Sequence, residues 1–216
     1  MPEQSRERAS SPQQQYARLL ASSVRLQQAY EAGAEPAAGR SVDDSDDADA
    51  QFNAVLRDRV TLIRQIEKPT TIEDAFPAVR VPTAAQVKER SAHAVAAAFE
   101  TGASDPERPV TNDDIEKTWS GSDWDAYNDA CATLARTYGY EVDADRGVWS
   151  KEDLRFQPVL FALPSPRGMG GNSRVGRLYV YRGAKEVLDY DRGSWNRAPI
   201  DEDTQRAIDR FVAVFG

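Results

Sequence analysis

The stretch that decides the fold runs from residue 177 to residue 191 and reads RLYVYRGAKEVLDYD. Apolar and polar side chains alternate over residues 177–182 and again over residues 186–191. A period of two is typical of β-strands. Gly183 and Ala184 separate the two runs and favour a turn. The stretch therefore predicts two strands of an antiparallel sheet that are joined directly by a turn.

Neighbouring segments extend this sheet and cover it. Residues 157–163 (QPVLFAL) form an apolar run with a proline near its start, which indicates a further strand. From Asp201 to Phe215 the apolar positions recur at helical spacing, so we expect an amphipathic helix against the sheet. Helices upstream, followed by a small antiparallel β-sheet with a C-terminal covering helix, define an α+β fold class.

The N-terminal part is predicted to be helical and to precede one globular domain. We expect a disordered tail over residues 1–12 and a helical hairpin or oligomerisation arm over residues 13–68. The arm contains an acidic linker at residues 34–47, and on both sides of it apolar residues recur at helical spacing. Pro69 ends the second helix of the arm. Residues 69–216 are then predicted to form an α+β globular domain.

Three further helices are expected between the arm and the sheet. They begin near Thr83, Thr111 and Ser122, whose side chains can cap the N-terminus of a helix. The last of them carries Cys131 on its apolar face, where a small buried cysteine is expected to be structural. Nothing in the sequence pairs this thiol with the single histidine, His93. With one histidine and one cysteine, neither a catalytic pair nor a zinc site is expected.

The composition restricts the surroundings in which this chain can work. Its 216 residues carry a net charge of −8 and a single cysteine, and its mean hydropathy is −0.63. No run of about eighteen apolar residues occurs, so no membrane-spanning helix is expected. One cysteine cannot form an internal disulfide, and the N-terminal residues lack an apolar stretch. Both observations favour a cytoplasmic location.

The charge is distributed unevenly along the chain. Residues 155–197, which we call the basic module, hold eight basic and three acidic side chains, whereas residues 1–154 sum to −11. The module contains a loop in which glycines allow close approach to an anion and arginines can bind phosphate or carboxylate. We interpret this loop as a site for an anion or a partner; the alternative is a mobile connection between strands. The candidate binding residues are Arg167, Gly168, Gly170, Gly171, Arg174, Arg177 and, beyond the loop, Trp195.

Trp195 stands between two arginines, Arg192 and Arg197, in a segment that also contains glycine and asparagine. A tryptophan beside arginines is typical of recognition surfaces, so this residue is a candidate interface residue. The alternative is that the indole anchors the C-terminal helix to the sheet. The sequence leaves both interpretations open.

Carboxylate chemistry is the one catalytic alternative that the sequence supports. Asp189 and Asp191 alternate along one strand and therefore share a face, where they could hold Mg²⁺ or Mn²⁺ for phosphodiester cleavage. The alternative is the solvent face of an edge strand. Acidic residues between positions 141 and 152 match part of a calcium-loop template, but Arg146 stands where that template requires glycine.

These patterns favour a non-catalytic interaction, accessory or structural-assembly protein without a cofactor. We expect it to contact a protein partner, or a second copy of itself, through its amphipathic helical region and its basic module. Nucleic acid is an alternative ligand of residues 155–197, and no membrane contact is expected. The alternatives are a small phosphoesterase or nuclease that uses Asp189, Asp191 and a divalent metal, and a nucleic-acid-binding accessory protein.

Overall fold

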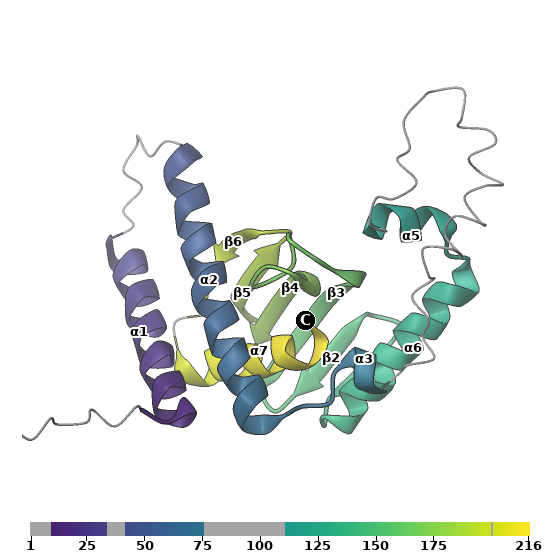
Figure 1. The fold of residues 1–216 in the computed structure, drawn as a ribbon, viewed down its shortest axis with the longest axis horizontal. Coiled ribbons are helices and arrows are strands. Elements are labelled where there is room, and N and C mark those ends of the chain that lie inside the picture. The colour runs from purple at the N-terminus through teal and green to yellow at the C-terminus, as the bar shows by residue number, and fades with distance from the viewer. Residues whose placement is uncertain (1–9, 34–41, 76–110, 200) are drawn as a thin grey trace, which may run out of the picture.

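The computed structural model describes residues 10–33, 42–75, 111–199 and 201–216, which form one sheet with helices packed on its inner side (Figure 1). The α+β class is confirmed. The helix predicted to begin near Thr83 and the histidine His93 lie outside the described residues. So do residues 1–9 of the predicted tail and residues 34–41 of the predicted linker. Within the described part of the chain, no helix is both long and apolar enough to cross a membrane.

A six-stranded antiparallel sheet forms the C-terminal part, and each strand pairs with the next one in sequence. The strands are β1 Glu141–Asp143, β2 Val148–Lys151, β3 Leu154–Ser165, β4 Ser173–Arg182, β5 Lys185–Asp191 and β6 Ser194–Arg197. The strands predicted at residues 157–163, 177–182 and 186–191 are confirmed as parts of β3, β4 and β5. The sequence did not predict β1, β2 and β6, because runs of three or four residues are too short to reveal a period.

The hairpin between β4 and β5 follows from its turn chemistry. Arg182 pairs with Lys185, so Gly183 and Ala184 are the two residues of the turn. Gly183 has a φ of 62°, a conformation that two-residue hairpin turns require and that glycine adopts without strain. Further along this pair of strands, the register shifts between Val180 and Tyr181.

A second register shift, between Val159 and Leu160, separates the two halves of the β3–β4 pair. There the ring of Phe161 lies against Gly176, where a Cβ would come within 2.5 Å of a ring carbon. Glycine is therefore required at position 176 for the two strands to keep this approach. Such irregularities increase the local twist of a sheet.

Helix α7 (Glu202–Phe215) covers the inner face of the sheet, as predicted. It begins at Asp201, whose side chain accepts a hydrogen bond from the backbone N–H of Thr204. The rings of Phe156 on β3 and Phe211 on α7 stack with centroids 5.3 Å apart and planes 7° apart. Nine of the fourteen residues of α7 are buried, because its other side is covered as well.

Helices α1 (Pro12–Gly33) and α2 (Val42–Glu67) supply that second cover (Figure 1). Asp209 of α7 is fully buried and meets Arg59 of α2, whose Nε lies 2.9 Å from its carboxylate. Tyr16 of α1 donates to the same carboxylate at 2.9 Å, and Gln205 donates at 3.1 Å. Arg59 also donates to Ser23 of α1 at 2.6 Å. A buried carboxylate thus joins three helices through charge and hydrogen bonds.

The helical pair and the sheet share one hydrophobic core. Leu20 of α1 and Leu56 of α2 belong to the same buried cluster as Leu178 of β4 and Phe211 of α7. Helix α2 begins at Val42, so the last residues of the predicted linker are helical. The boundary predicted at residue 69 therefore does not separate two cores.

Three more helices complete the described fold: α3 (Ile72–Ala75), α5 (Asn112–Thr118) and α6 (Gly121–Thr137). Ser120 and Asp123 form the capping box of α6, two residues before the Ser122 cap expected from the sequence. In Figure 1, α2 and α6 lie on opposite sides of α7. Cys131 of α6 is 2% exposed, and burial raises the pKa of its thiol to about 11. This cysteine is accordingly a core residue.

Candidate functional site

The glycine-rich loop between β3 and β4 is folded back on the chain. All five backbone N–H groups of residues 167–171 donate to acceptors within the protein. Gly170 donates to Asn53 of α2 at 2.9 Å, and Gly171 donates to the carbonyl of Gly168 at 2.7 Å. A Cβ on Gly168 would collide with a carbonyl of β4. The glycines therefore serve close approach within the protein, and these N–H groups are already engaged.

The three arginines predicted to bind an anion lie in different surroundings. Arg167 is exposed in the loop, and its carbonyl accepts a hydrogen bond from Tyr190. Arg174 is 5% exposed and donates to the carbonyl of Ala162. Arg177 lies on the other side of the sheet, in an ion pair described below. The loop does not assemble these guanidinium groups into one cluster.

Trp195 lies at an intramolecular contact between β6 and α2. Its ring packs against Phe52 of α2 at a centroid distance of 5.9 Å and against Tyr190 at 5.3 Å. Its indole N–H donates to Asn53 at 3.2 Å, and its backbone N–H donates to Asp49 at 3.0 Å. The residue anchors an N-terminal helix to the sheet, rather than the C-terminal helix that the sequence suggested.

Asp189 and Asp191 share one face of β5, as the alternation predicts. Asp191 lies 2.9 Å from the guanidinium of Arg177 and 3.9 Å from that of Arg192. Asp189 accepts a hydrogen bond from Asn196 at 3.1 Å. A metal ion at Asp191 would meet two positive charges, which opposes its binding. No group of three or more His, Cys, Asp or Glu side chains that could hold a metal occurs among the described residues.

A surface that the sequence did not predict as a unit lies on the other side of the sheet, although Arg177, Asp189 and Asp191 belong to it. We define the outer face as the side chains of β3, β4 and β5 that point away from α7. Its central strand, β4, presents Tyr179 and Tyr181, which are partly exposed, while Leu178 and Val180, which alternate with them, are fully buried. The nine residues of the outer face are Arg155, Gln157, Val159, Arg177, Tyr179, Tyr181, Glu186, Asp189 and Asp191.

Strand pairing arranges the outer face in three rows across β3, β4 and β5. The first row is Arg155, Tyr181 and Glu186, and the second is Gln157, Tyr179 and Asp189. The third row is Val159, Arg177 and Asp191. Each row therefore runs from a basic or uncharged residue on β3 to a carboxylate on β5.

Aromatic and basic side chains contact one another on this face. The guanidinium of Arg155 lies 5.7 Å from the ring centroid of Tyr181, and that of Arg177 lies 6.0 Å from Tyr179. Both are cation–π distances. Partial burial and the neighbouring Glu186 raise the pKa of Tyr181, while the hydrogen bond and charge of Asp191 raise that of Arg177. The tyrosine is thus a neutral hydrogen-bond donor and the arginine a permanent cation at neutral pH.

Val159 adds apolar surface beside these rings. It is 49% exposed, which makes it the one strongly exposed large hydrophobic residue among those that the structure describes. The alternation in β3 and β4 could have revealed these residues, because the side opposite the apolar positions carries two tyrosines and two arginines. The outer face thus combines aromatic, basic and apolar side chains.

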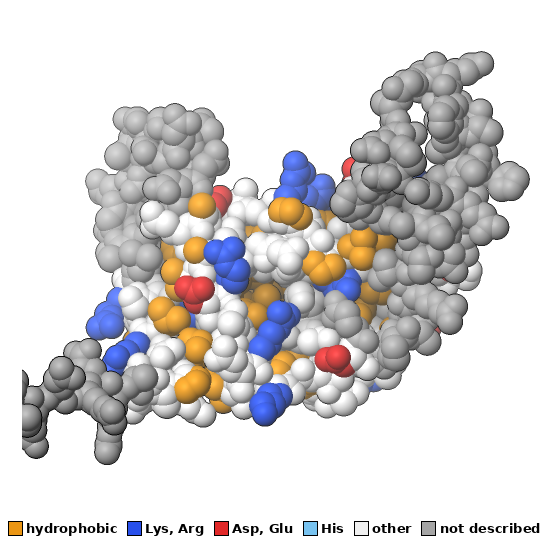
Figure 2. All heavy atoms as spheres, in the orientation of Figure 1, with side chains coloured by type: hydrophobic (Ala, Val, Ile, Leu, Met, Phe, Trp, Pro, Cys, Tyr) orange, Lys and Arg blue, Asp and Glu red, His pale blue; other side chains and the backbone are white. Residues whose placement is uncertain are grey.

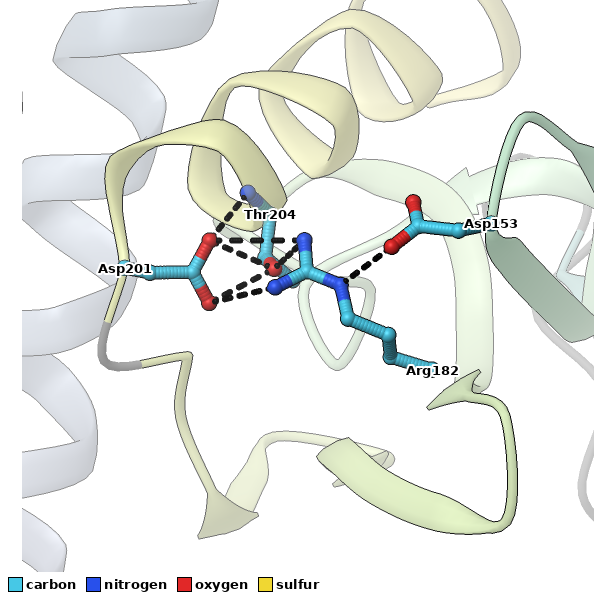
Figure 3. Close-up of polar contacts among 4 residues, drawn as sticks. All are labelled: Asp153, Arg182, Asp201 and Thr204. Atoms are coloured by element: carbon cyan, nitrogen blue, oxygen red, sulfur yellow. Dashed lines mark hydrogen bonds and ion pairs between the residues drawn. The ribbon is translucent and has the colours of Figure 1, made fainter.

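A polar cluster fastens the end of β4 to α7 (Figure 3). Arg182 reaches Asp153, in the β2–β3 turn, at 2.8 Å and Thr204 at 2.9 Å, and lies 3.4 Å from Asp201. Desolvation raises the pKa of Asp201, but hydrogen bonds from Thr204 and the charge of Arg182 outweigh it, so the pKa lies below its usual range. This cluster fixes the strand next to Tyr181, and so positions the outer face.

The opposite side of the molecule, which carries α2 and α7, differs in character (Figure 2). Apolar and basic side chains are interspersed there and do not gather into one continuous patch. Several of the basic groups serve the fold. Arg64 of α2 donates to the carbonyls of Ala213 and Gly216 at the end of α7, and Arg210 pairs with Glu67 at 2.9 Å.

Residues 142–216 match the model of a family described as a domain of unknown function (DUF7678). The matched segment holds most of β1, the other five strands and α7, whereas α1, α2, α5 and α6 lie before it. The comparison with curated proteins gave no match, and the comparison with solved structures gave none. The family description states no activity, so the function has to be argued from the chemistry of the outer face.

Proposed function

We propose that this chain is a non-catalytic interaction protein that binds a protein partner through its outer face. The observation that carries the proposal is the pair of partly exposed tyrosines on β4, Tyr179 and Tyr181, which we call the aromatic strip. Each tyrosine has a guanidinium group over its ring. Tyrosine and arginine are enriched in protein interfaces and among the residues that dominate binding energy. The surface lies within the basic module, but it shares only Arg177 with the binding residues predicted for the loop.

The side chains of the outer face are held in place before any partner arrives. Tyr181 interacts with Glu186 and lies beneath Arg155, and Arg177 is fixed by its ion pair with Asp191. Side chains that are already ordered lose less conformational entropy on binding. An ordered aromatic strip on a sheet suits a contact surface better than it suits a mobile active-site lid.

The charges of the outer face favour protein over nucleic acid as the ligand. Glu186, Asp189 and Asp191 stand along β5, directly beside the aromatic strip. Phosphate groups of a nucleic acid laid across the tyrosines would meet these carboxylates, and nucleic-acid affinity depends mainly on neutralised phosphates. A protein partner can offer both signs of charge.

The proposal includes a cytoplasmic location. The chain has a single cysteine, Cys131, which is buried and cannot stabilise the fold through an internal disulfide. The proposal does not use the helical hairpin as a free oligomerisation arm, because α1 and α2 pack on α7 and contribute to the shared core. Their proposed role is to complete the core beneath the contact surface.

Site-specific photo-crosslinking in the native host tests the proposal. A photoreactive amino acid replaces Gln157, which is exposed on β3 in the middle row of the outer face. The matched control replaces Asp203, which is exposed on the first turn of α7. We expect protein adducts from position 157 and not from position 203. Adducts from neither position, with both variants folded, would contradict the proposal.

A further inference from the structure

The charges of the outer face that form no ion pair among the described residues lie on two different strands. Arg155 of β3 makes no ion pair with a carboxylate among the described residues; it donates to the carbonyl of Gly183 and covers Tyr181. On β5, Glu186 interacts with the neutral hydroxyl of Tyr181, and Asp189 accepts from a neutral amide. Positive charge thus remains on one side of β4 and negative charge on the other.

Other charged groups near these residues do not remove this polarity. Arg177 and Asp191 neutralise each other at 2.9 Å. Arg197 of β6 stands opposite Asp189 in the register and donates its guanidinium N–H to the carbonyl of Glu186 at 2.8 Å. It partly offsets the negative charge of β5, and it lies on β6, beyond the three strands that make up the outer face.

A surface with this arrangement is complementary to itself. A two-fold axis parallel to β4, lying in the plane between two facing sheets, exchanges left and right of β4 and keeps the position along the strand. It places β4 of one copy over β4 of the second copy, and β3 of one copy over β5 of the second copy. Sheets that pack face to face keep their strands within about 30° of one another, so this overlap extends over several residues.

The rows of the outer face coincide under this symmetry. Arg155 and Glu186 share one row and lie one strand to either side of Tyr181. The axis therefore brings Arg155 over Glu186 of the second copy, and the reverse contact forms at the same time. In the next row Gln157 meets Asp189 of the second copy, and the tyrosines of the two β4 strands meet at the centre.

We propose that the partner of the outer face is a second copy of this chain, bound face to face about a two-fold axis along β4. The inference rests on the proposed function, because it names the occupant of the same surface. Closed two-fold dimers are the commonest protein oligomers, and each contact in them occurs twice. The resulting dimer contains aromatic contacts at its centre and two Arg155–Glu186 pairs beside them.

Sedimentation equilibrium of the full chain, with charge-reversed variants, tests this arrangement. Arg155→Glu and Glu186→Arg each place like charges opposite one another twice in the dimer. We expect each to raise the dissociation constant of the dimer at least about tenfold. Mixing the two variants places the glutamate introduced at position 155 opposite the arginine introduced at position 186, and the native Glu186 opposite the native Arg155, so both contact positions regain an opposite pairing. Heterodimers are therefore expected to be tighter than either homodimer.

Arg136→Glu is the matched control, because Arg136 is exposed on α6 and lies outside the outer face. It changes the net charge of the chain by the same amount as Arg155→Glu and should leave the dissociation constant unchanged. Circular dichroism and thermal unfolding verify that each variant is folded.

The outcomes separate this inference from the proposed function. A wild-type chain that stays monomeric at high concentration, or a dimer that is insensitive to both reversals, overturns the second copy as partner. If the photoreactive residue at position 157 then crosslinks to a different protein in the host, the proposed function stands and that protein is the partner. If the chain is a monomer and position 157 gives no adduct, both proposals fail.

Discussion

The side chain of Cys131 points from α6 into the core, where burial raises the pKa of its thiol to about 11. The thiolate is the reactive form, so at pH 8 the folded protein contains very little of it. Alkylation by iodoacetamide is expected to be at least about a hundredfold slower in the native protein than in the urea-unfolded chain, whose thiol has a pKa near 8.5. Mass spectrometry over time measures both rates, and comparable rates would show that Cys131 is accessible.

At the scale of one element, Asp201 determines how α7 begins. Its folded pKa is depressed, so the stabilisation that it provides is present above the unfolded pKa and is lost as the pH falls through the folded value. Asp201→Ala removes the cap and should lower the free energy of unfolding by about 1 kcal/mol at neutral pH. The difference from wild type should shrink as the pH is lowered below about 4.

Urea unfolding at a series of pH values measures the Asp201 effect. Asp203→Ala is the control, because Asp203 lies in the same first turn of α7 and is exposed. It should cost less than Asp201→Ala and show a weaker dependence on pH. A cost of Asp201→Ala that stays constant down to acid pH would contradict the assigned role of the carboxylate.

For the whole molecule, the buried pair of Arg59 and Asp209 ties the N-terminal helices to the covering helix of the sheet. Asp209→Leu leaves the arginine buried without its counter-charge, so we expect a loss of about 3–5 kcal/mol in unfolding free energy. Replacing both partners, as Arg59→Met with Asp209→Leu, removes the stranded charge and should cost less than Asp209→Leu alone.

A double-mutant cycle in urea measures the coupling between these two residues. Arg59→Met alone completes the cycle. Costs of the two single variants that add up in the double variant would show that the pair is not coupled, and that other contacts hold α2 to α7.

The predictability of this fold depended on how local each signal was. The β4–β5 hairpin could be predicted because alternation and Gly183 both act within a few residues. Short strands such as β6 (Ser194–Arg197) could not, because their pairing comes from the neighbouring strand. The polar residue Asp209 among apolar positions of α7 was a signal for a buried partner, but the sequence could not say that this partner was Arg59.

For the candidate site, too, the sequence carried local signals but not the contacts made by residues far apart in the chain. Glycines in the loop were predicted to allow close approach to an anion, and in the structure Gly168 and Gly170 approach other parts of the chain. Trp195 was predicted to be an interface residue or an anchor for the C-terminal helix, and in the structure its ring packs against α2. The outer face depends on which side of β4 meets α7, and this is decided by packing over the whole sheet.

The fully buried carboxylate of Asp209 has a consequence for how this architecture can diverge. Position 209 lies inside the segment that matches the family model, whereas Arg59 and Tyr16 lie outside it. A chain that keeps the segment but lacks an equivalent of α2 would leave this acid without its cation. In such chains we expect an apolar residue at position 209, or a different covering element that carries its own basic side chain. The residue at this position should therefore indicate whether a related chain has helices equivalent to α1 and α2.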